Sequence, residues 1–135
     1  MPTLAQKRAA DAYNKVYAIA HQSEFEGIRK NYGSLARSIS SMIQINGLGP
    51  TLAFLKAKAE GNSQKPSMIL YGHFNSWLIS QIRDSTQNPA DFLHWITNQN
   101  STAYHKATIE ALEYGNWIKR FAEAEGLSGD DSGEI

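Results

Sequence analysis

The side chains that could perform chemistry are few, and they do not form a recognisable catalytic motif. Cysteine is absent, and the histidines are His21, His73, His94 and His105. No HExxH or similar metal-binding pair is present, and Asp91-x-x-His94 lacks the second copy and the further carboxylates that a di-iron site needs. Glu110 and Glu113 are explained as solvated charges on a helix. We therefore expect no catalytic, metal or cofactor site, although a ribonuclease-type His/Lys pair that meets only in the fold stays open as an alternative.

Charge is distributed unevenly along the chain, although the net charge is zero. Residues 1–65 hold nine basic and four acidic side chains, whereas residues 66–135 hold four basic and nine acidic ones. The last fifteen residues hold five carboxylates and no lysine or arginine. A basic body with an acidic tail is compatible with a patch for a polyanion, and also with an ordinary solvated surface of mixed charge.

Apolar residues recur at steps of three and four along most of the chain, which is the spacing of amphipathic helices. Pro66 is expected to begin one helix, Pro89 to begin another after an N-capping Asn88, and Gly126 to end the last one. The expected helices cover 4–20, 24–45 with a break near 30–33, 51–59, 66–83, 89–97 and about 101–125. The sequence thus predicts an all-α fold, a compact single-domain bundle of six to seven helices over residues 1–126. A short disordered acidic tail is expected over 127–135.

The stretch 41–61, SMIQINGLGPTLAFLKAKAEG, interrupts a long apolar pattern with two glycines and a proline. Gly47 can adopt a positive φ and end one helix, and Pro50 suits the first turn of the next. The stretch has neither the preceding strand nor the Lys-Ser/Thr ending of a phosphate-binding P-loop. It is therefore interpreted as a sharp bend between two packed helices.

The large aromatic residues fall mostly at the spacing of a helical core. We expect them to pack in the interior rather than to stack on nucleic-acid bases. The residues in question are Phe74, Trp77, Trp95, Trp117 and Phe121. Four tyrosines suit either a boundary or an interface, namely Tyr13, Tyr17, Tyr71 and Tyr114.

The chain has no signal that directs it to a membrane. No apolar run approaches the length of a membrane span, and the first fifteen residues are charged, without the apolar core of a secretory signal. Together with the absence of cysteine, this favours a cytoplasmic protein that has no membrane partner.

Three blocks of sequence resemble a known family. They are QKRAADAYNKV near the start, YGSLARSISSMIQINGLGPTLAFLKAK in the middle, and YHKATIEALEYGNWIKRFAEA near the end. In this order and spacing they are similar to the small α-helical subunit of the type III-B (Cmr) CRISPR effector complex. The resemblance covers roughly residues 4–125.

The resemblance implies a subunit with no catalytic role. In that family, copies of the subunit stack into a minor filament beside the backbone subunits and the large subunit, and a basic face lines the channel of the guide RNA–target RNA duplex. The basic residues in or near the matching blocks are the candidate RNA contacts. They are Lys7, Arg8, Lys15, Arg37, Lys56, Lys58, Lys119 and Arg120.

Two other functions stay open from the sequence. One is a helical adaptor that binds only protein. The other is a small DNA-binding regulator of the helix-turn-helix type, for which TLAFLKAKA offers only two lysines to a recognition helix.

Overall fold

The structure, a computed structural model, describes residues 1–82 and 89–127. In these residues the chain forms six α-helices and one 3-10 helix and has no strand, so the predicted all-α bundle is confirmed. The elements are α1 (Leu4–His21), η1 (Ser23–Ile28), α2 (Arg29–Asn46), α3 (Leu48–Ala59), α4 (Pro66–Ser80), α5 (Phe92–Ile96) and α6 (Ser101–Ala124).

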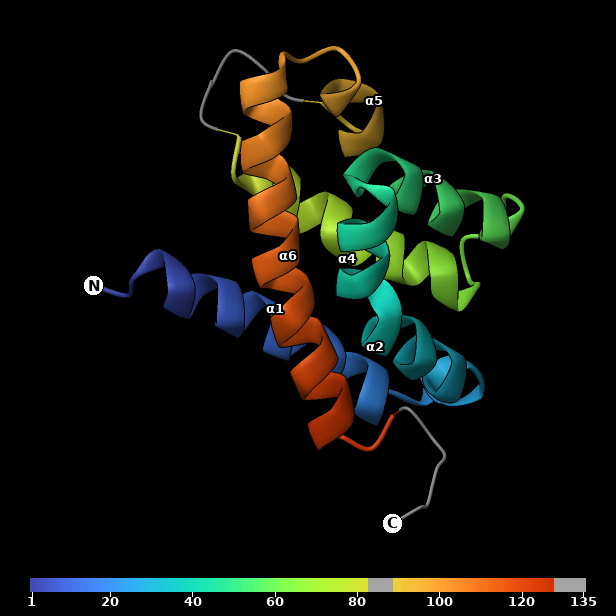
Figure 1. Ribbon diagram of the computed structural model, residues 1–135. Helices are drawn as coiled ribbons and strands as arrows, with labels where there is room; N and C mark the ends of the chain where they lie inside the picture. The colour runs from blue at the N-terminus through green and yellow to red at the C-terminus, as the bar shows by residue number, and fades with distance from the viewer. Residues whose placement is uncertain (83–88, 128–135) are drawn as a thin grey trace.

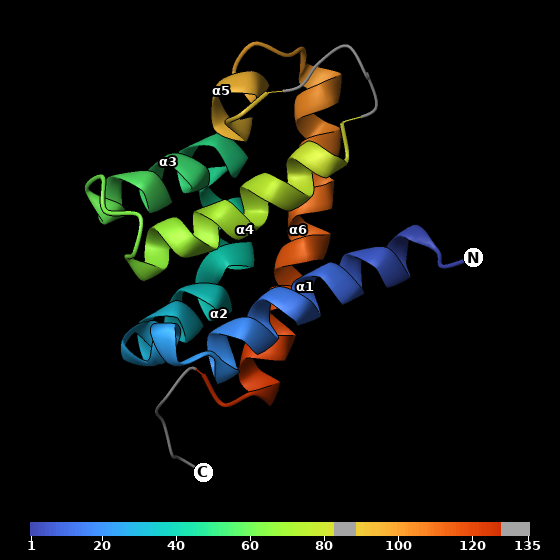
Figure 2. The same cartoon turned by 180° about the vertical axis from the view of Figure 1, so that it is seen from behind.

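The longest helix, α6, runs through the length of the molecule and contacts most of the others (Figure 1). Helix α1 crosses its C-terminal half on one side, as the view from behind shows (Figure 2). Helix α2 packs antiparallel to α6, because Ile39 lies beside Gly115 while Ile43 and Gly47 share a pocket with Tyr104. Helices α3 and α4 pack against each other, and α5 contacts both of them.

The core is contributed by every α-helix. Its largest fully buried side chains include Tyr32, Phe74, Phe92 and Tyr114. Helices α2 and α6 approach closely at Gly115, where an added Cβ would lie 2.6 Å from Ser40 Oγ. A glycine in the middle of a long helix is thus explained by packing.

Local capping fixes where several elements begin and end. Thr3 and Gln6 form a capping box at the start of α1, and Pro66 occupies the first turn of α4. Gly126 has a φ of 71° and donates to Glu123 O, while Leu127 N–H donates to Ala122 O, which makes a Schellman motif. Leu127 is only 5% exposed, so the folded part extends one residue into the predicted tail. Residues 128–135, the rest of that tail, lie outside the described residues.

The structure corrects three local expectations. The break expected near 30–33 lies earlier, because 23–28 form a 3-10 helix that passes directly into α2. Pro89 precedes α5 instead of opening it, since the helix begins at Phe92; Asn88, its expected cap, lies outside the described residues. Trp117 was predicted to be core but is 37% exposed.

Candidate nucleic-acid interface

The eight basic residues predicted to contact RNA fall into two groups. Arg8, Lys15, Lys56 and Arg120 each pair with a carboxylate of the same chain. Within residues 1–82 and 89–127, no side-chain hydrogen bond or ion pair engages the other four, which are Lys7, Arg37, Lys58 and Lys119. A cation already held by a buried carboxylate is poorly placed to bind phosphate, so the second group is the better source of an interface.

Arg8 is fixed inside the bundle. It is 9% exposed, and its Nε and Nη2 donate to the two carboxylate oxygens of Glu110 at 2.5 and 2.8 Å. Trp77 Nε1–H donates to the same carboxylate at 2.8 Å. Hydrogen bonding to Glu110 raises the pKa of Arg8. Arg8 therefore leaves the set of candidate RNA contacts, and Glu110, expected to be a solvated charge, is instead its structural partner.

Lys15 is held by three neighbouring groups. Its Nζ lies 2.7 Å from Asp11 Oδ2 and donates to Ser76 Oγ at 2.5 Å and to the carbonyl of His73 at 3.1 Å. The Tyr114 hydroxyl donates to Asp11 in turn. We call the set that joins α1 to α4 and α6 the α1 network. Its members are Arg8, Asp11, Lys15, His73, Ser76, Trp77, Glu110 and Tyr114.

His73 is the histidine most strongly influenced by the fold. Burial, with a smaller contribution from the charge of Lys15, lowers the pKa of His73 to about 3. The Tyr32 hydroxyl lies 2.7 Å from its Nδ1, and burial raises the pKa of Tyr32. A histidine that stays neutral in this setting fits a structural role in the core boundary better than acid–base chemistry.

Lys56 and Arg120 are paired less tightly than Arg8. Lys56 donates to Asp91 Oδ2 at 3.1 Å, and its ammonium lies 5.2 Å from the centroid of the Tyr71 ring. Burial raises the pKa of Asp91, but hydrogen bonds from Tyr71 and Lys56 outweigh this effect and hold the pKa below its usual value. Arg120 forms an exposed i,i+3 pair with Glu123, which is a weak interaction.

A polar groove of about 780 Å³ separates α2 from the α3–α4 connection. We call it the α2–α4 groove. Asn31, Ser34 and Ser38 line it from α2, and Lys58 and Lys65 line it from the other side. The nearest carboxylate paired with either lysine is Glu60, whose side chain is 79% exposed and whose Oε1 lies 3.9 Å from Lys65 Nζ.

The positive surface continues from the groove along α2. Lys30 and Arg37 are exposed, and they stand four and three residues from Ser34, so they share its side of the helix. Arg37 and Lys58 are among the RNA contacts expected from the sequence, whereas Lys30 and Lys65 were not named there. The row Lys30, Ser34, Arg37 and Ser41, spaced at helical steps beside the apolar stripe, is the signal that identifies this face.

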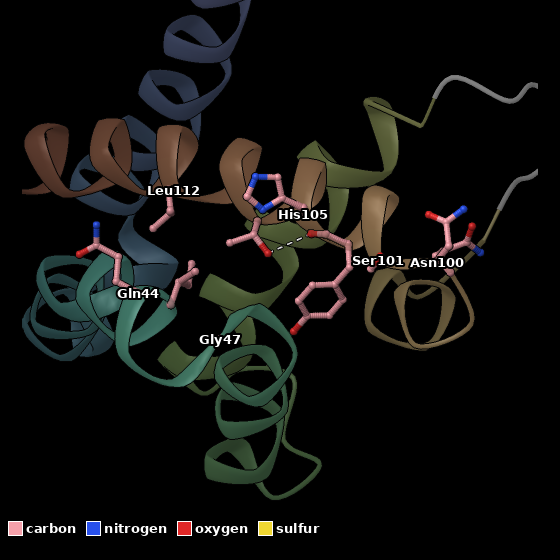
Figure 3. A pocket seen from close by; sticks show the side chains of 10 residues that line it. Gln44, Gly47, Asn100, Ser101, His105 and Leu112 are labelled. Carbon is pink, nitrogen blue, oxygen red and sulfur yellow. Dashed lines mark hydrogen bonds between the residues drawn. The ribbon is translucent and has the colours of Figure 1, made fainter.

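The bend at Gly47 has the geometry that the sequence predicted. Gly47 has a φ of 95° and ends α2, and Gly49 N–H donates to the Tyr104 hydroxyl at 2.7 Å. A pocket of about 720 Å³ lies beside the bend, between Gln44 and Leu112 on one side and Asn100 and Ser101 on the other (Figure 3). Its ten lining residues include no lysine, arginine or carboxylate, so it offers no charge to a phosphate.

A row of aromatic side chains crosses from α1 to α6. Tyr13 lies edge-on to Phe121 and beside Tyr17, and Phe121 stacks on Trp117 with ring centroids 5.3 Å apart. Tyr13, Tyr17 and Trp117 are 42%, 46% and 37% exposed. These rings pack against one another at the surface instead of filling the core.

Two further kinds of site find no support in the described residues. There, no three side chains of His, Cys, Asp or Glu are grouped so that they could hold a metal ion. None of the described helices is both long and apolar enough to cross a bilayer.

Comparison with known proteins confirms the resemblance seen in the sequence. Residues 4–125 match the model of the CRISPR-associated protein family Cas_Cmr5. The crystal structure of a CRISPR-associated Cmr5 family protein from Thermus thermophilus is similar with a TM-score of 0.70. The two are 24% identical, and the similarity covers 92% of this chain and 97% of that one, which shows a common fold. The chain therefore belongs to the Cmr5 family and is a subunit of the type III-B Cmr complex.

Proposed function

We propose that the protein is a non-catalytic scaffold subunit of the type III-B effector complex. Copies of it stack into a minor filament beside the backbone and large subunits, and a basic surface contacts the guide RNA–target RNA duplex. An RNA duplex is recognised through its shape and its phosphates, and the sequence is read by base pairing with the guide. Such a subunit needs cations on a rigid surface and no catalytic group of its own.

The observation that carries the proposal is the charge around the α2–α4 groove. Lys30, Arg37, Lys58 and Lys65 gather on one side of the bundle, and the carboxylate that pairs there is the exposed Glu60. By contrast, Lys15, Lys56 and Arg8 are held by Asp11, Asp91 and Glu110. Part of the basic excess in residues 1–65 therefore lies on one local surface, where the cations are free to bind phosphate.

The structure disfavours the DNA-regulator alternative. A recognition helix needs polar and basic side chains on its exposed face. In α3 the exposed residues after its first turn are Ala53, Phe54, Ala57 and Lys58, which are mostly apolar. The adaptor alternative differs from the scaffold in that it binds only protein, so the titration with RNA described next separates the two.

The test is a reconstituted complex that carries Arg37→Ala and Lys58→Ala together in this subunit, titrated with target RNA at several salt concentrations. Each lost phosphate contact should lower the slope of log affinity against log salt by about one. Lys106→Ala, an exposed lysine on α6, is the matched control. Cutting at saturating target should stay at the wild-type rate, and its loss with affinity preserved would contradict a non-catalytic role.

A further inference from the structure

The acidic tail, residues 128–135, is a feature of the sequence that the proposed function leaves without a role. Its residues, SGDDSGEI, include Asp130, Asp131 and Glu134 and no lysine or arginine. The basic surface around the α2–α4 groove has the opposite imbalance, and the carboxylate that pairs there is the exposed Glu60. Its cations are Lys30, Arg37, Lys58 and Lys65. The two parts of the chain are therefore complementary in charge.

The tail starts beside the first turn of α2. Leu127, the residue before it, is buried and so fixed on the bundle. His21 Nε2 lies 3.1 Å from Glu125 Oε1, which joins the end of α1 to the end of α6. Arg29 Nε donates to the carbonyl of Ile19 at 2.6 Å, which joins the same end of α1 to the start of α2. The chain thus leaves α6 at the end of the bundle where α2 begins (Figure 1).

The basic surface is within reach of a segment that starts here. Eight residues span at most about 26–29 Å when extended. Lys30 is the second residue of α2, and Arg37 stands seven residues further along, or about 10 Å at the rise of an α-helix. Ile28 and Asn31 line the α2–α4 groove, so the groove also begins at this end of α2. The carboxylates of the tail can therefore lie over these cations without any change in the described fold.

Tethering makes a weak attraction effective. A segment attached beside its site has an effective concentration in about the millimolar range. Contacts between exposed charges each contribute little and are screened by salt, so an RNA duplex with its dense row of phosphates can replace them. Glu24 and Glu26 are exposed on η1 and carry the same sign as the tail, so they offer it no competing site near its start.

We propose that residues 128–135 occupy the basic surface around the α2–α4 groove when RNA is absent, and that the RNA duplex displaces them. The tail is then an internal competitor of RNA. It opposes the binding of stray RNA to a single subunit, whereas the many phosphate contacts of an assembled complex displace it. This inference rests on the proposed contact with RNA and adds a regulation to that contact.

The test compares the full-length protein with a variant whose tail keeps its length and loses its charge. The neutral tail carries Asp130→Asn, Asp131→Asn and Glu134→Gln. Because the chain has no cysteine, Ser132→Cys places a single nitroxide spin label on either tail. The label broadens the amide resonances of residues that lie close to it, and these are recorded without RNA and after addition of a short double-stranded RNA.

Without RNA, the acidic tail should broaden the resonances of residues 30–38 and 58–65, and the RNA duplex should restore them. The neutral tail should broaden them less, and residues 101–106, at the other end of α6, should be unaffected by either tail. Equal broadening by the two tails, or broadening that RNA leaves in place, would overturn the proposal. Broadening that grows with protein concentration would place the tail on a second copy and would also overturn it.

RNA affinity gives the second measurement, made on the unlabelled proteins between about 50 and 200 mM salt. The neutral tail should bind the duplex about threefold to tenfold more tightly at the low end, and the two affinities should converge at the high end, because salt screens the competing contacts. A gain in affinity without the broadening that depends on tail charge would indicate repulsion by an undocked tail, and the inference would be wrong.

Failure of the tail and failure of the RNA contact give different results. If Arg37→Ala and Lys58→Ala lowered the salt slope while the acidic and neutral tails bound RNA equally, the proposed RNA contact would stand and the inference would be wrong. If neither substitution changed RNA binding, the proposed function would fail, and the inference would fail with it.

Discussion

The α1 network and the α2–α4 groove use the same residue types in opposite ways. In the network, Arg8 and Lys15 face Glu110 and Asp11, and their charges are neutralised inside the protein. In the groove, Lys58 and Lys65 face serines and asparagines of α2 and of the α3–α4 connection. The difference lies in what stands opposite the cation. Where a largely buried carboxylate faces it, the cation supports the fold. Where neutral polar groups face it, or for Lys65 also the exposed Glu60, the cation remains available for a partner.

The largest expected effect comes from breaking the network at Arg8. Among the described residues, Arg8→Ala leaves the carboxylate of Glu110 with Trp77 as its remaining hydrogen-bond partner. Since hydrogen bonds to charged groups contribute about 1.5–3 kcal/mol, we expect the free energy of unfolding to fall by about 2–3 kcal/mol. Urea denaturation measures this loss, and Lys7→Ala, one residue away on the exposed face, should change stability by less than about 0.5 kcal/mol. If Arg8→Ala and Lys7→Ala lowered the free energy of unfolding equally, paired and unpaired cations would not differ in what they contribute to the fold.

A second effect is a pH dependence that arises from His73 beside the network. Its folded pKa of about 3 lies below that of an unfolded histidine, about 6.5, so between these values the unfolded state holds a proton that the folded state lacks. This contribution to stability is complete above pH 6.5 and is lost as the pH falls towards 3. From pH 6.5 to 5 the loss should reach about 2 kcal/mol.

The control for this dependence is His73→Asn, which keeps a side-chain group able to bond the Tyr32 hydroxyl but cannot titrate. Denaturation at several pH values should show a shallower acid slope in the variant than in wild type, whatever its stability at pH 7. Identical slopes would show that His73 has the same pKa in the folded and in the unfolded protein. In that case His73 would be accessible to water in the folded protein, and the region around the α1 network would be less tightly packed than the structure indicates.

A substitution at Gly47 tests whether folding and RNA binding can be separated at the bend between α2 and α3. The φ of 95° at Gly47 is unfavourable for any residue with a Cβ, although the space around it is adequate, with Pro50 Cδ at 3.5 Å. Gly47→Ala should therefore destabilise the protein by about 1 kcal/mol or more. Since the pocket beside the bend is uncharged, RNA binding by the folded fraction should be unchanged. A variant as stable as wild type that binds RNA poorly would make the bend part of the interface.

Local signals explain how far the sequence could predict this molecule. Pro66, Gly47 and Gly126 were placed correctly, because a proline in a first turn and a glycine with positive φ depend on their immediate neighbours. The prediction that Pro89 begins a helix was wrong, because α5 begins only at Phe92. An apparent cap and a proline can precede a helix without starting it. The prediction that Trp117 lies in the core was wrong. Periodicity assigns a residue to the apolar side of a helix, but it does not show how far a neighbouring helix covers that side.

The division of the basic residues was beyond local reasoning. Arg8 and Glu110 are separated by 102 positions, and so their pairing depends on how α1 crosses α6. A count of charges identified the basic half of the chain. It could not show which of those cations pair with carboxylates in the folded protein. The family blocks did not help here, since they contain Arg8 and Arg37 alike.

The smallest effect, and the sharpest test of the comparison, is a contrast between two lysines that are close neighbours on α3. Lys56 donates to Asp91 and lies over Tyr71, whereas Lys58 lines the groove with no carboxylate partner in the described part of the chain. Lys58→Ala should lower the salt slope of RNA binding by about one and weaken all sequences alike, and Lys56→Ala should leave the slope unchanged. Conversely, Lys56→Ala should lower stability by up to about 1 kcal/mol, because a partly exposed ion pair contributes little more, and Lys58→Ala should leave it unchanged. If the two lysines exchanged these roles, or contributed equally to the slope, internal pairing would not decide which cations are available to RNA.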